Sequence, residues 1–222
     1  MSKYPYRQDR EEMKELLHQY DNLIAGRSHS FIDEEAFEKI IDYFDEKDQL
    51  ELSLEAAEHA VEQYPYSASL LLKKCDLLIA SKKYKQALHF LDQAALLDNR
   101  DINLYILRTD ALLALDQHSR AAAVLETALD FFEGDEKIEL LFELADVHDD
   151  YENFDKVFDC MKMILELEPL NEEALYKICF WTDFTGRNEE GIRLHQQIID
   201  EHPFSELAWF NLAAAYQGIK LY

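Results

Sequence analysis

Apolar side chains recur along this chain in steps of three and four, which places them on one face of an α-helix. These steps run through Phe37, Ile40, Ile41 and Phe44, through Leu71, Cys75 and Leu78, through Leu141, Leu144 and Ala145, and through Leu175, Ile178 and Cys179. Other stretches set one large apolar residue between two small ones. They run through Ala87, Leu91 and Ala94 and through Ala121, Leu125 and Ala128. Because small side chains let two helices approach closely, the alternation predicts paired helices.

The whole pattern has a period of 34 residues, as Ala60, Ala94 and Ala128 illustrate. A repeat of this length is typical of stacked helical hairpins. The units run over 34–67, 68–101, 102–135, 138–171, 172–205 and, in part, 206–222. Two extra residues fall within 132–135, where we expect a loop. Three units close on a proline, which has no amide donor to continue a helix. These prolines are Pro65, Pro169 and Pro203.

The last unit contains the spacing W-x-x-L-A-x-x-Y, formed by Trp209, Leu212, Ala213 and Tyr216, with Pro203 just before it. In this spacing the chain resembles the tetratricopeptide repeat family, and the resemblance covers roughly residues 34–222. It implies an all-α fold, a right-handed superhelical solenoid of antiparallel helix pairs, in which the first helix of each pair lines a concave surface. It also implies a protein-binding role without catalysis.

Four residues depart from the family pattern. Lys74 and Arg108 stand where a large apolar residue is usual, and Gly191 and His195 replace core residues in the second helix of the fifth unit. Matches at several positions in each of five units are hard to obtain by chance. We therefore expect the departures to leave the fold intact.

A separate amphipathic helix is predicted before the repeats. Its apolar residues are Met13, Leu16, Leu17, Tyr20, Leu23 and Ile24. Gly26 supplies a natural stop, residues 26–30 read as a linker, and Asp33 is a candidate N-cap for the first repeat helix. We thus divide the chain into a helix and linker over 1–30 and a solenoid of about five and a half repeats over 31–222. The first helix either covers the end of the first hairpin or docks to a partner or a second copy.

The other end of the chain is too apolar for a helix that faces water, although terminal repeats normally have a polar outer face. Its apolar residues are Trp209, Phe210, Leu212, Ala213, Tyr216, Ile219, Leu221 and Tyr222. Two interpretations are open. Either the chain is the N-terminal part of a longer repeat protein, incomplete at its C-terminal end, or this helix is covered by self-association.

The sharpest functional signal is a column of carboxylates at equivalent places in four consecutive units. The column consists of Asp42, Asp76, Asp110 and Asp146. Equivalent atoms in neighbouring hairpins lie roughly 10 Å apart, the spacing of packed helices. Repulsion between neighbours in water is then only about 0.4 kcal/mol, so an unoccupied column costs little.

A second column of apolar residues runs beside the first. It consists of Leu72, Ile106, Phe142, Tyr176 and Phe210. Around the fifth unit Tyr176, Phe180 and Phe184 lie a turn apart, which makes them the best candidate for an anchoring pocket. The two columns together predict a groove for an extended peptide with basic residues and a bulky apolar side chain.

A plainer interpretation of both columns stays open. Acids are abundant, so the aspartates could be solvated, or could pair with Lys39, Lys73 and Lys177 on adjacent turns for a few tenths of a kcal/mol. The apolar column could pack in part between neighbouring first helices. In that case the chain would be a structural solenoid that mediates oligomerisation or continues into further repeats.

The composition of the chain restricts the classes of molecule that it can bind. The formal net charge is -24, which disfavours nucleic acid and anionic membranes because no basic stripe can neutralise phosphates. One subgroup of the resembled family grips acidic C-termini with Lys, Arg and Asn, but here the matching surface carries Glu38 and the aspartates, so the sign is wrong. The chain has no run of eighteen apolar residues and no secretory signal within residues 1–10. We expect a cytoplasmic protein.

Catalysis is not expected. The chain has three cysteines, Cys75, Cys160 and Cys179, and no C-x-x-C pair. We expect their thiols to be reduced and to pack between helices. The nearest candidate metal site combines Asp146, His148 and one of Asp149 or Asp150, but the register places His148 in the core between helices, away from the carboxylates. No phosphate-binding loop or H-E-x-x-H motif is present. We predict no cofactor.

Overall fold

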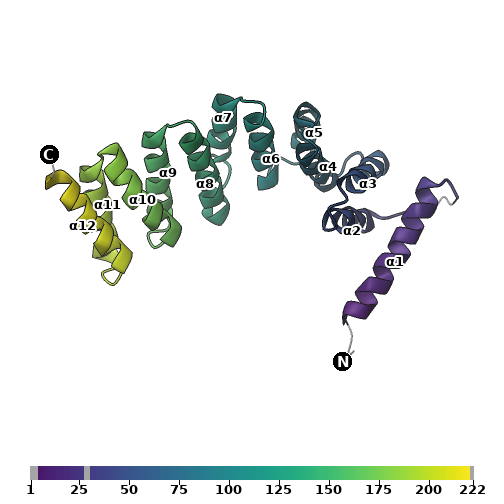
Figure 1. The fold of residues 1–222 in the computed structure, drawn as a ribbon, viewed down its shortest axis with the longest axis horizontal. Coiled ribbons are helices and arrows are strands. Elements are labelled where there is room, and N and C mark those ends of the chain that lie inside the picture. Colours follow the sequence, from purple (N-terminus) through teal and green to yellow (C-terminus); the bar gives the residue numbers. More distant parts are fainter. Residues whose placement is uncertain (1–4, 28–30, 221–222) are drawn as a thin grey trace. The chain divides into compact units, whose positions relative to one another are not determined.

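The computed structural model describes residues 5–27 and 31–220, and within that part of the chain it contains twelve α-helices and no strand (Figure 1). The helices fall into two compact units, residues 1–115 and 116–222. Within each unit, the consecutive helices of the repeats are joined by short turns and pack against one another. The predicted all-α class with paired helices is confirmed.

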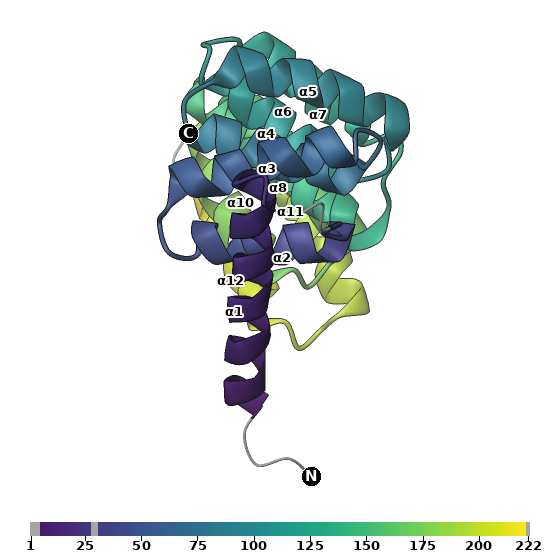
Figure 2. The ribbon, with the colours of Figure 1, turned by 90° about the vertical axis from the view of Figure 1, so that its right-hand side faces the viewer.

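Unit 1 contains the predicted N-terminal helix, two hairpins and one further first helix. Its helices are α1 (Pro5–Ile24), α2 (Glu34–Asp45), α3 (Leu50–Gln63), α4 (Ala68–Ala80), α5 (Tyr84–Leu97) and α6 (Ile102–Leu113). In this unit α2 pairs with α3 and α4 pairs with α5. The N-terminal half of α1 projects beyond the hairpins of the unit (Figure 2).

Unit 2 begins with a second helix and continues through two hairpins to a last first helix. Its helices are α7 (His118–Ala128), α8 (Gly134–Asp150), α9 (Phe154–Leu167), α10 (Glu172–Thr185), α11 (Asn188–Glu201) and α12 (Glu206–Lys220). Here α8 packs on α9, and α11 packs on α12. The first helices α10 and α12 also contact each other.

Five of the first helices start on a side chain that caps them, whereas α8 begins after Glu133 without such a cap. The capping residues are Asp33, Ser67, Asp101, Asn171 and Ser205. Each oxygen accepts a hydrogen bond from a backbone amide two or three residues on, for example Ala36 N to Asp33 Oδ1 at 2.8 Å, which satisfies an amide that has no partner in the helix. Asp33 was predicted as a cap, and the prediction is confirmed.

The turn inside each hairpin contains one residue in the left-handed backbone conformation. These residues are Asp48, Lys82, Asp116, Glu152 and Gly186, with φ between 56° and 71°. They are 34 residues apart except between Asp116 and Glu152, where the spacing is 36 because of the two extra residues. Backbone geometry therefore repeats with the period that was read from the apolar residues.

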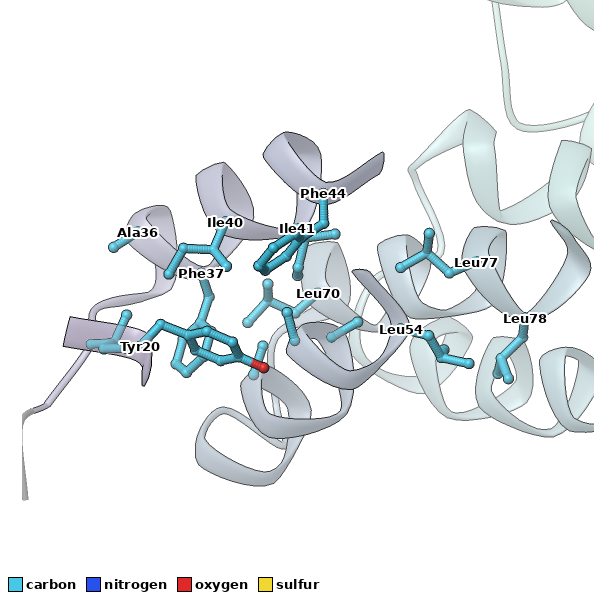
Figure 3. Packing of buried hydrophobic residues seen from close by; sticks show 14 of the residues in the cluster. Tyr20, Ala36, Phe37, Ile40, Ile41, Phe44, Leu54, Leu70, Leu77 and Leu78 are labelled. Carbon is cyan, nitrogen blue, oxygen red and sulfur yellow. The ribbon is translucent and has the colours of Figure 1, made fainter. Parts of the chain in front are cut away.

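The core of unit 1 is built from the predicted apolar faces (Figure 3). Three large side chains of this core, Phe37, Ile40 and Leu70, have no exposed surface. Tyr20 of α1 is 3% exposed and its ring lies 6.4 Å from that of Phe37. The apolar stripe of α1 is thus used to cover α2, in agreement with the first of the two roles expected for it.

Two local expectations need correction or lie outside the described residues. The loop predicted over 132–135 ends earlier, because α8 begins at Gly134, and Phe132 is 5% exposed and joins the core. The linker predicted over 26–30 falls partly on residues 28–30, which the structure does not describe. The division of the chain at residue 30 therefore stays a prediction.

The departures from the family pattern have physical explanations. Lys74 lies in the core position but places its Nζ 4.1 Å from the ring centroid of Phe90, and Arg108 places Nη2 3.0 Å from Asp92 Oδ1. Gly191 is required by close helix packing, since a Cβ there would lie 2.6 Å from Thr182 Cγ2. His195 has no exposed surface and fills the place of a core residue.

Candidate functional site

The three aspartates of the acidic column in unit 1 lie at the same place on α2, α4 and α6. Asp42, Asp76 and Asp110 are all exposed. Asp42 forms an ion pair with Lys73 of α4, the first helix of the next repeat. The place that Lys73 occupies in α4 is filled by Leu107 in α6, so Asp76 receives no equivalent lysine.

Asp76 and Asp110 consequently form no ion pair with any residue that the structure describes. The pKa of Asp76 is raised, first by partial burial and then by the charge of Asp45, while Lys73 opposes the shift. Partial burial also raises the pKa of Asp110, with a contribution from Asp76. The surface between α4 and α6 is therefore a place where a cation would be favoured.

The fourth aspartate, in unit 2, has a cation nearby. Lys177 Nζ lies 3.9 Å from Asp146 Oδ1 and 2.9 Å from Glu173 Oε1, and it lies 5.1 Å from the ring centroid of Phe142. The alternative of lysine pairing thus holds for Asp42 and Asp146. It does not extend to Lys39, which pairs with Glu35 at 2.6 Å.

The apolar column is less uniform than the sequence suggests. Leu72 is only 7% exposed and packs with Leu71, Cys75 and Leu104, so it belongs to the core and cannot offer a large contact to a ligand. Ile106 and Phe142 are half-buried. These two residues therefore offer less exposed surface to a ligand than the sequence suggests.

Exposed aromatic residues gather on α10 of unit 2. Tyr176 is 78% exposed, Phe180 58% and Phe184 56%. The rings of Phe180 and Phe184 are stacked with centroids 5.6 Å apart. On α12, Phe210 is 66% exposed. A cluster of large exposed rings is typical of a surface that binds a ligand or a partner.

Two further aromatic residues support these rings, and the sequence did not single them out as site residues. Trp181 packs edge-on against both Phe180 and Phe184, with centroids 4.8 Å and 5.7 Å away. Phe154, the first residue of α9, stacks on Trp181 at 5.2 Å and meets Phe184 at 4.8 Å. Phe154 stands at the start of the second helix of its hairpin, and the folded structure shows that its ring reaches α10.

Comparison with known proteins agrees with this architecture. No family model and no curated protein sequence matches the chain. The crystal structure of MamA protein matches 77% of this chain and 92% of its own, at 16% identity and a TM-score of 0.56. YrrB, described as a TPR protein with an unusual peptide-binding site, matches 80% and 91% at 18% identity with a TM-score of 0.52. A tetratricopeptide repeat protein from Parabacteroides merdae matches 84% and 73% at 19% identity with a TM-score of 0.58.

The chain has a tetratricopeptide-repeat fold. At these identities the likeness establishes the backbone architecture alone. The residues that bind a ligand in a tetratricopeptide-repeat protein vary between members, so the binding chemistry of this chain has to come from its own side chains.

The hollows of the surface include one beside the aromatic rings. A hollow of about 320 Å³ is lined by Phe154, Phe184 and Thr185 together with Glu152, Asp155 and Lys156. A larger one, of about 690 Å³, lies at the turn between α11 and α12 around Pro203 and Phe204. The larger hollow lies at the repeat-to-repeat turn and includes none of the residues of the two columns.

The metal site considered for α8 does not assemble. His148 is 4% exposed, and burial lowers the pKa of its imidazole, whereas Asp149 and Asp150 are exposed on the helix surface. Within residues 5–27 and 31–220, no group of three or more His, Cys, Asp or Glu side chains could hold a metal ion. Burial raises the pKa of both Cys75 and Cys160 to about 12, so these thiols stay protonated.

The last helix of the tetratricopeptide-repeat fold exposes a face that is buried in the earlier hairpins. Trp209 is 50% exposed, although its equivalents Leu141 and Leu175 are at most 1% exposed. Tyr216 is 47% exposed, and its equivalent Thr182 is 3% exposed. No helix among the described residues is long and apolar enough to span a membrane.

Proposed function

We propose that this protein is a non-catalytic interaction scaffold whose first helices bind an extended peptide segment of a basic partner. The observation that carries the proposal is the contrast within the acidic column. Asp42 has a lysine partner, but Asp76 and Asp110 do not, and the pKa values of both are raised. A lysine or arginine of a partner would supply the missing charge at little cost in side-chain desolvation.

Unit 2 supplies the second kind of contact. Tyr176, Phe180, Phe184 and Phe210 are more than half exposed, and large rings that lose water on binding contribute most to interface energies. YrrB shares the fold and is described as having a peptide-binding site. We therefore propose two binding surfaces, each described within its own unit: the acidic surface of unit 1 and the aromatic surface of unit 2.

The proposal includes no cofactor, no nucleic acid and no membrane. It places the protein in the cytoplasm, in keeping with three free cysteines of which two are buried. The strong negative charge, formally -24, would speed the approach of a basic partner at low salt.

Charge reversal tests the proposal. The probe is an extended Gly-Ser peptide that carries lysine and leucine side chains, titrated into the full chain at low and physiological salt. We expect the double variant D76K/D110K to lose affinity about tenfold or more, since two attractions become repulsions. The matched control is E51K/E58K, which makes the same change in net charge on exposed residues of α3.

Equal loss of affinity in the variant and its control would mean that only net charge matters, and the groove would be excluded. Unchanged affinity in D76K/D110K would exclude it as well. Circular dichroism of both variants should show the same melting temperature as the parent chain within a few degrees, because the four side chains are exposed.

Self-association through α12 is a second candidate function, favoured by the exposure of Trp209 and Tyr216 on a face that is buried in α8 and α10. A second copy would cover this face. Light scattering over a range of concentrations should then show dimers that the variant W209E/Y216E dissociates. A monomer at every concentration would exclude this candidate and leave the peptide groove unaffected.

A further inference from the structure

Cations in unit 2 are held by a recurring combination of an aromatic ring and carboxylates. The Arg187 Cζ lies 4.1 Å from the ring centroid of Phe158, while Nη1 lies 2.7 Å from Asp159 Oδ1 and Nη2 2.8 Å from Glu190 Oε2. The guanidinium therefore stacks on a ring and is neutralised at its edge in one geometry. Lys177 follows the same rule with the ring of Phe142.

The exposed face of α10 carries this combination without a cation of its own. Phe180 and Phe184 are stacked and more than half exposed. The exposed carboxylate of Asp183 stands three residues after Phe180, a spacing that makes two side chains neighbours on a helix surface. In the part of the chain that the structure describes, no lysine or arginine lies over either ring or pairs with Asp183.

The cations closest in sequence and space are already engaged. Lys177 is one turn before Phe180 but contacts Glu173 and the ring of Phe142. Lys156 lines the hollow beside Phe184 but pairs with Glu126 at 3.2 Å. The vacant ring and carboxylate combination is thus not filled from within.

The rings are held in place from behind. Trp181 packs edge-on against Phe180 and Phe184, and Phe154 of α9 closes the cluster. A ligand that stacks on these rings does not have to order them first, which lowers the entropic cost of binding. The hollow of about 320 Å³ beside Phe184 also presents Glu152 and Asp155 to a ligand.

Arginine fits this surface better than the other candidates. A planar guanidinium stacks on a ring and still donates to a carboxylate at its edge, and it is more weakly hydrated than an ammonium. An aliphatic side chain would cover the same rings but would take water from Asp183 without replacing it. The charge of the chain, formally -24, favours a cation throughout.

We propose that the Phe180, Asp183 and Phe184 surface of α10 is a subsite for an arginine side chain of the partner peptide. This inference rests on the proposed peptide-binding function and deepens it, because it replaces the bulky apolar anchor expected there with a stacked guanidinium.

Three matched peptides test the subsite. Each is the extended Gly-Ser peptide with flanking lysines, and the central residue is arginine, lysine or norleucine. Titrations use the full chain with W209F, so that Trp181 alone reports binding by fluorescence. We expect the arginine peptide to bind about threefold or more tightly than either of the others, and to change the emission of Trp181.

Two variants assign the preference to the surface. F180L/F184L keeps apolar bulk but removes the ring faces, and D183N removes the charge but keeps the shape. Both should abolish the arginine preference while the lysine and norleucine peptides keep their affinity, and D183N should also reduce the salt dependence. The control is F204L, which changes a ring that is 95% exposed at the turn before α12, and it should leave the preference intact.

The remaining outcomes are decisive in other ways. Equal affinity of all three peptides, or tightest binding by norleucine, would overturn the arginine subsite and leave the scaffold function standing. Failure of all three to bind would overturn both. Circular dichroism of F180L/F184L identifies a folding defect, and in that event D183N, an exposed change, still decides between the outcomes.

Discussion

Units 1 and 2 present equivalent positions of equivalent helices but offer different chemistry. In unit 1 the exposed positions of α4 and α6 are the unpaired acids Asp76 and Asp110, flanked one turn on by the small residues Ala80 and Ala114. In unit 2 the corresponding positions of α10 are Phe180 and Phe184. The repeat fixes where a side chain lies, whereas the individual residue determines what that surface binds.

The units also differ in how they tolerate acid, and this is the largest effect we predict. His195 in α11 has no exposed surface, and neither ring nitrogen has a hydrogen-bond partner among the described residues. Burial lowers the pKa of its imidazole to about 4. Unfolded histidine titrates near 6.5 and binds its proton first, so the stability of unit 2 is complete above that pH and falls as pH drops toward 4, by up to about 3 kcal/mol.

Hydrogen exchange at neutral pH and at mildly acidic pH checks this difference. Amides of α11 should lose protection on acidification much more than those of α5 in unit 1, and His195→Leu should remove most of the loss. An equal response of α5 and α11, or an unchanged response in the variant, would show that the buried imidazole does not set the acid sensitivity.

Arg187 gives the next largest effect. It contacts Glu190, Asp159 and the ring of Phe158, while the equivalent residue in unit 1, Lys83, is exposed. Arg187→Lys should lower the free energy of unfolding by about 1–2 kcal/mol, because a lysine cannot make the planar contacts. Lys83→Arg is the control and should change it by less than about 0.5 kcal/mol. Equal effects of the two substitutions in denaturant titrations would mean that the contacts of the Arg187 guanidinium add no stability to unit 2.

The left-handed residues in the hairpin turns allow the backbone strain of the two units to be compared. Gly186 in unit 2 has φ 71°, and Lys82 at the same place in unit 1 has φ 60°. Gly186→Ala should destabilise by about 1 kcal/mol, and Lys82→Gly should stabilise by at most about 0.5–1 kcal/mol, since only glycine adopts this conformation without a steric cost. Thermal unfolding of both variants measures the signs, and equal signs would contradict a shared turn geometry.

The smallest effect concerns the acids themselves. Asp110→Asn should stabilise the fold by a few tenths of a kcal/mol, because it removes a carboxylate whose pKa is raised by burial and by Asp76. Asp42→Asn should destabilise the fold by a similar amount, because it breaks the pair with Lys73. Acidification stabilises a folded state that holds a carboxyl of raised pKa, so Asp110 responds to pH with the sign opposite to that of His195. Chemical denaturation of the two variants would detect a failure of this sign difference.

Much of the backbone could be predicted from the sequence. The 34-residue period, the apolar faces and the closing prolines depend on local spacing, and the helices end two residues before Pro65, Pro169 and Pro203. The caps at Ser67, Asp101, Asn171 and Ser205 were also readable as a recurrence of small polar residues, although only Asp33 was predicted.

The site was predicted less well, because it depends on contacts between helices. Spacing placed Leu72 and Tyr176 in one column, yet one is 7% and the other 78% exposed. The lysine that pairs with Asp42 comes from the next repeat. Asp76 lacks such a lysine because Leu107 takes the same position in the repeat after it. Such differences appear only when the side chains of neighbouring first helices are compared pair by pair.

An NMR titration of the full chain with the arginine-containing peptide tests the central claim most directly. If the first helices carry two different binding surfaces, amide and side-chain shifts should move on α4 and α6 around Asp76 and Asp110 and on α10 around Phe180 and Phe184, and the second helices α5 and α11 should stay unchanged. Shifts confined to the second helices, or no shifts at saturating peptide, would contradict it.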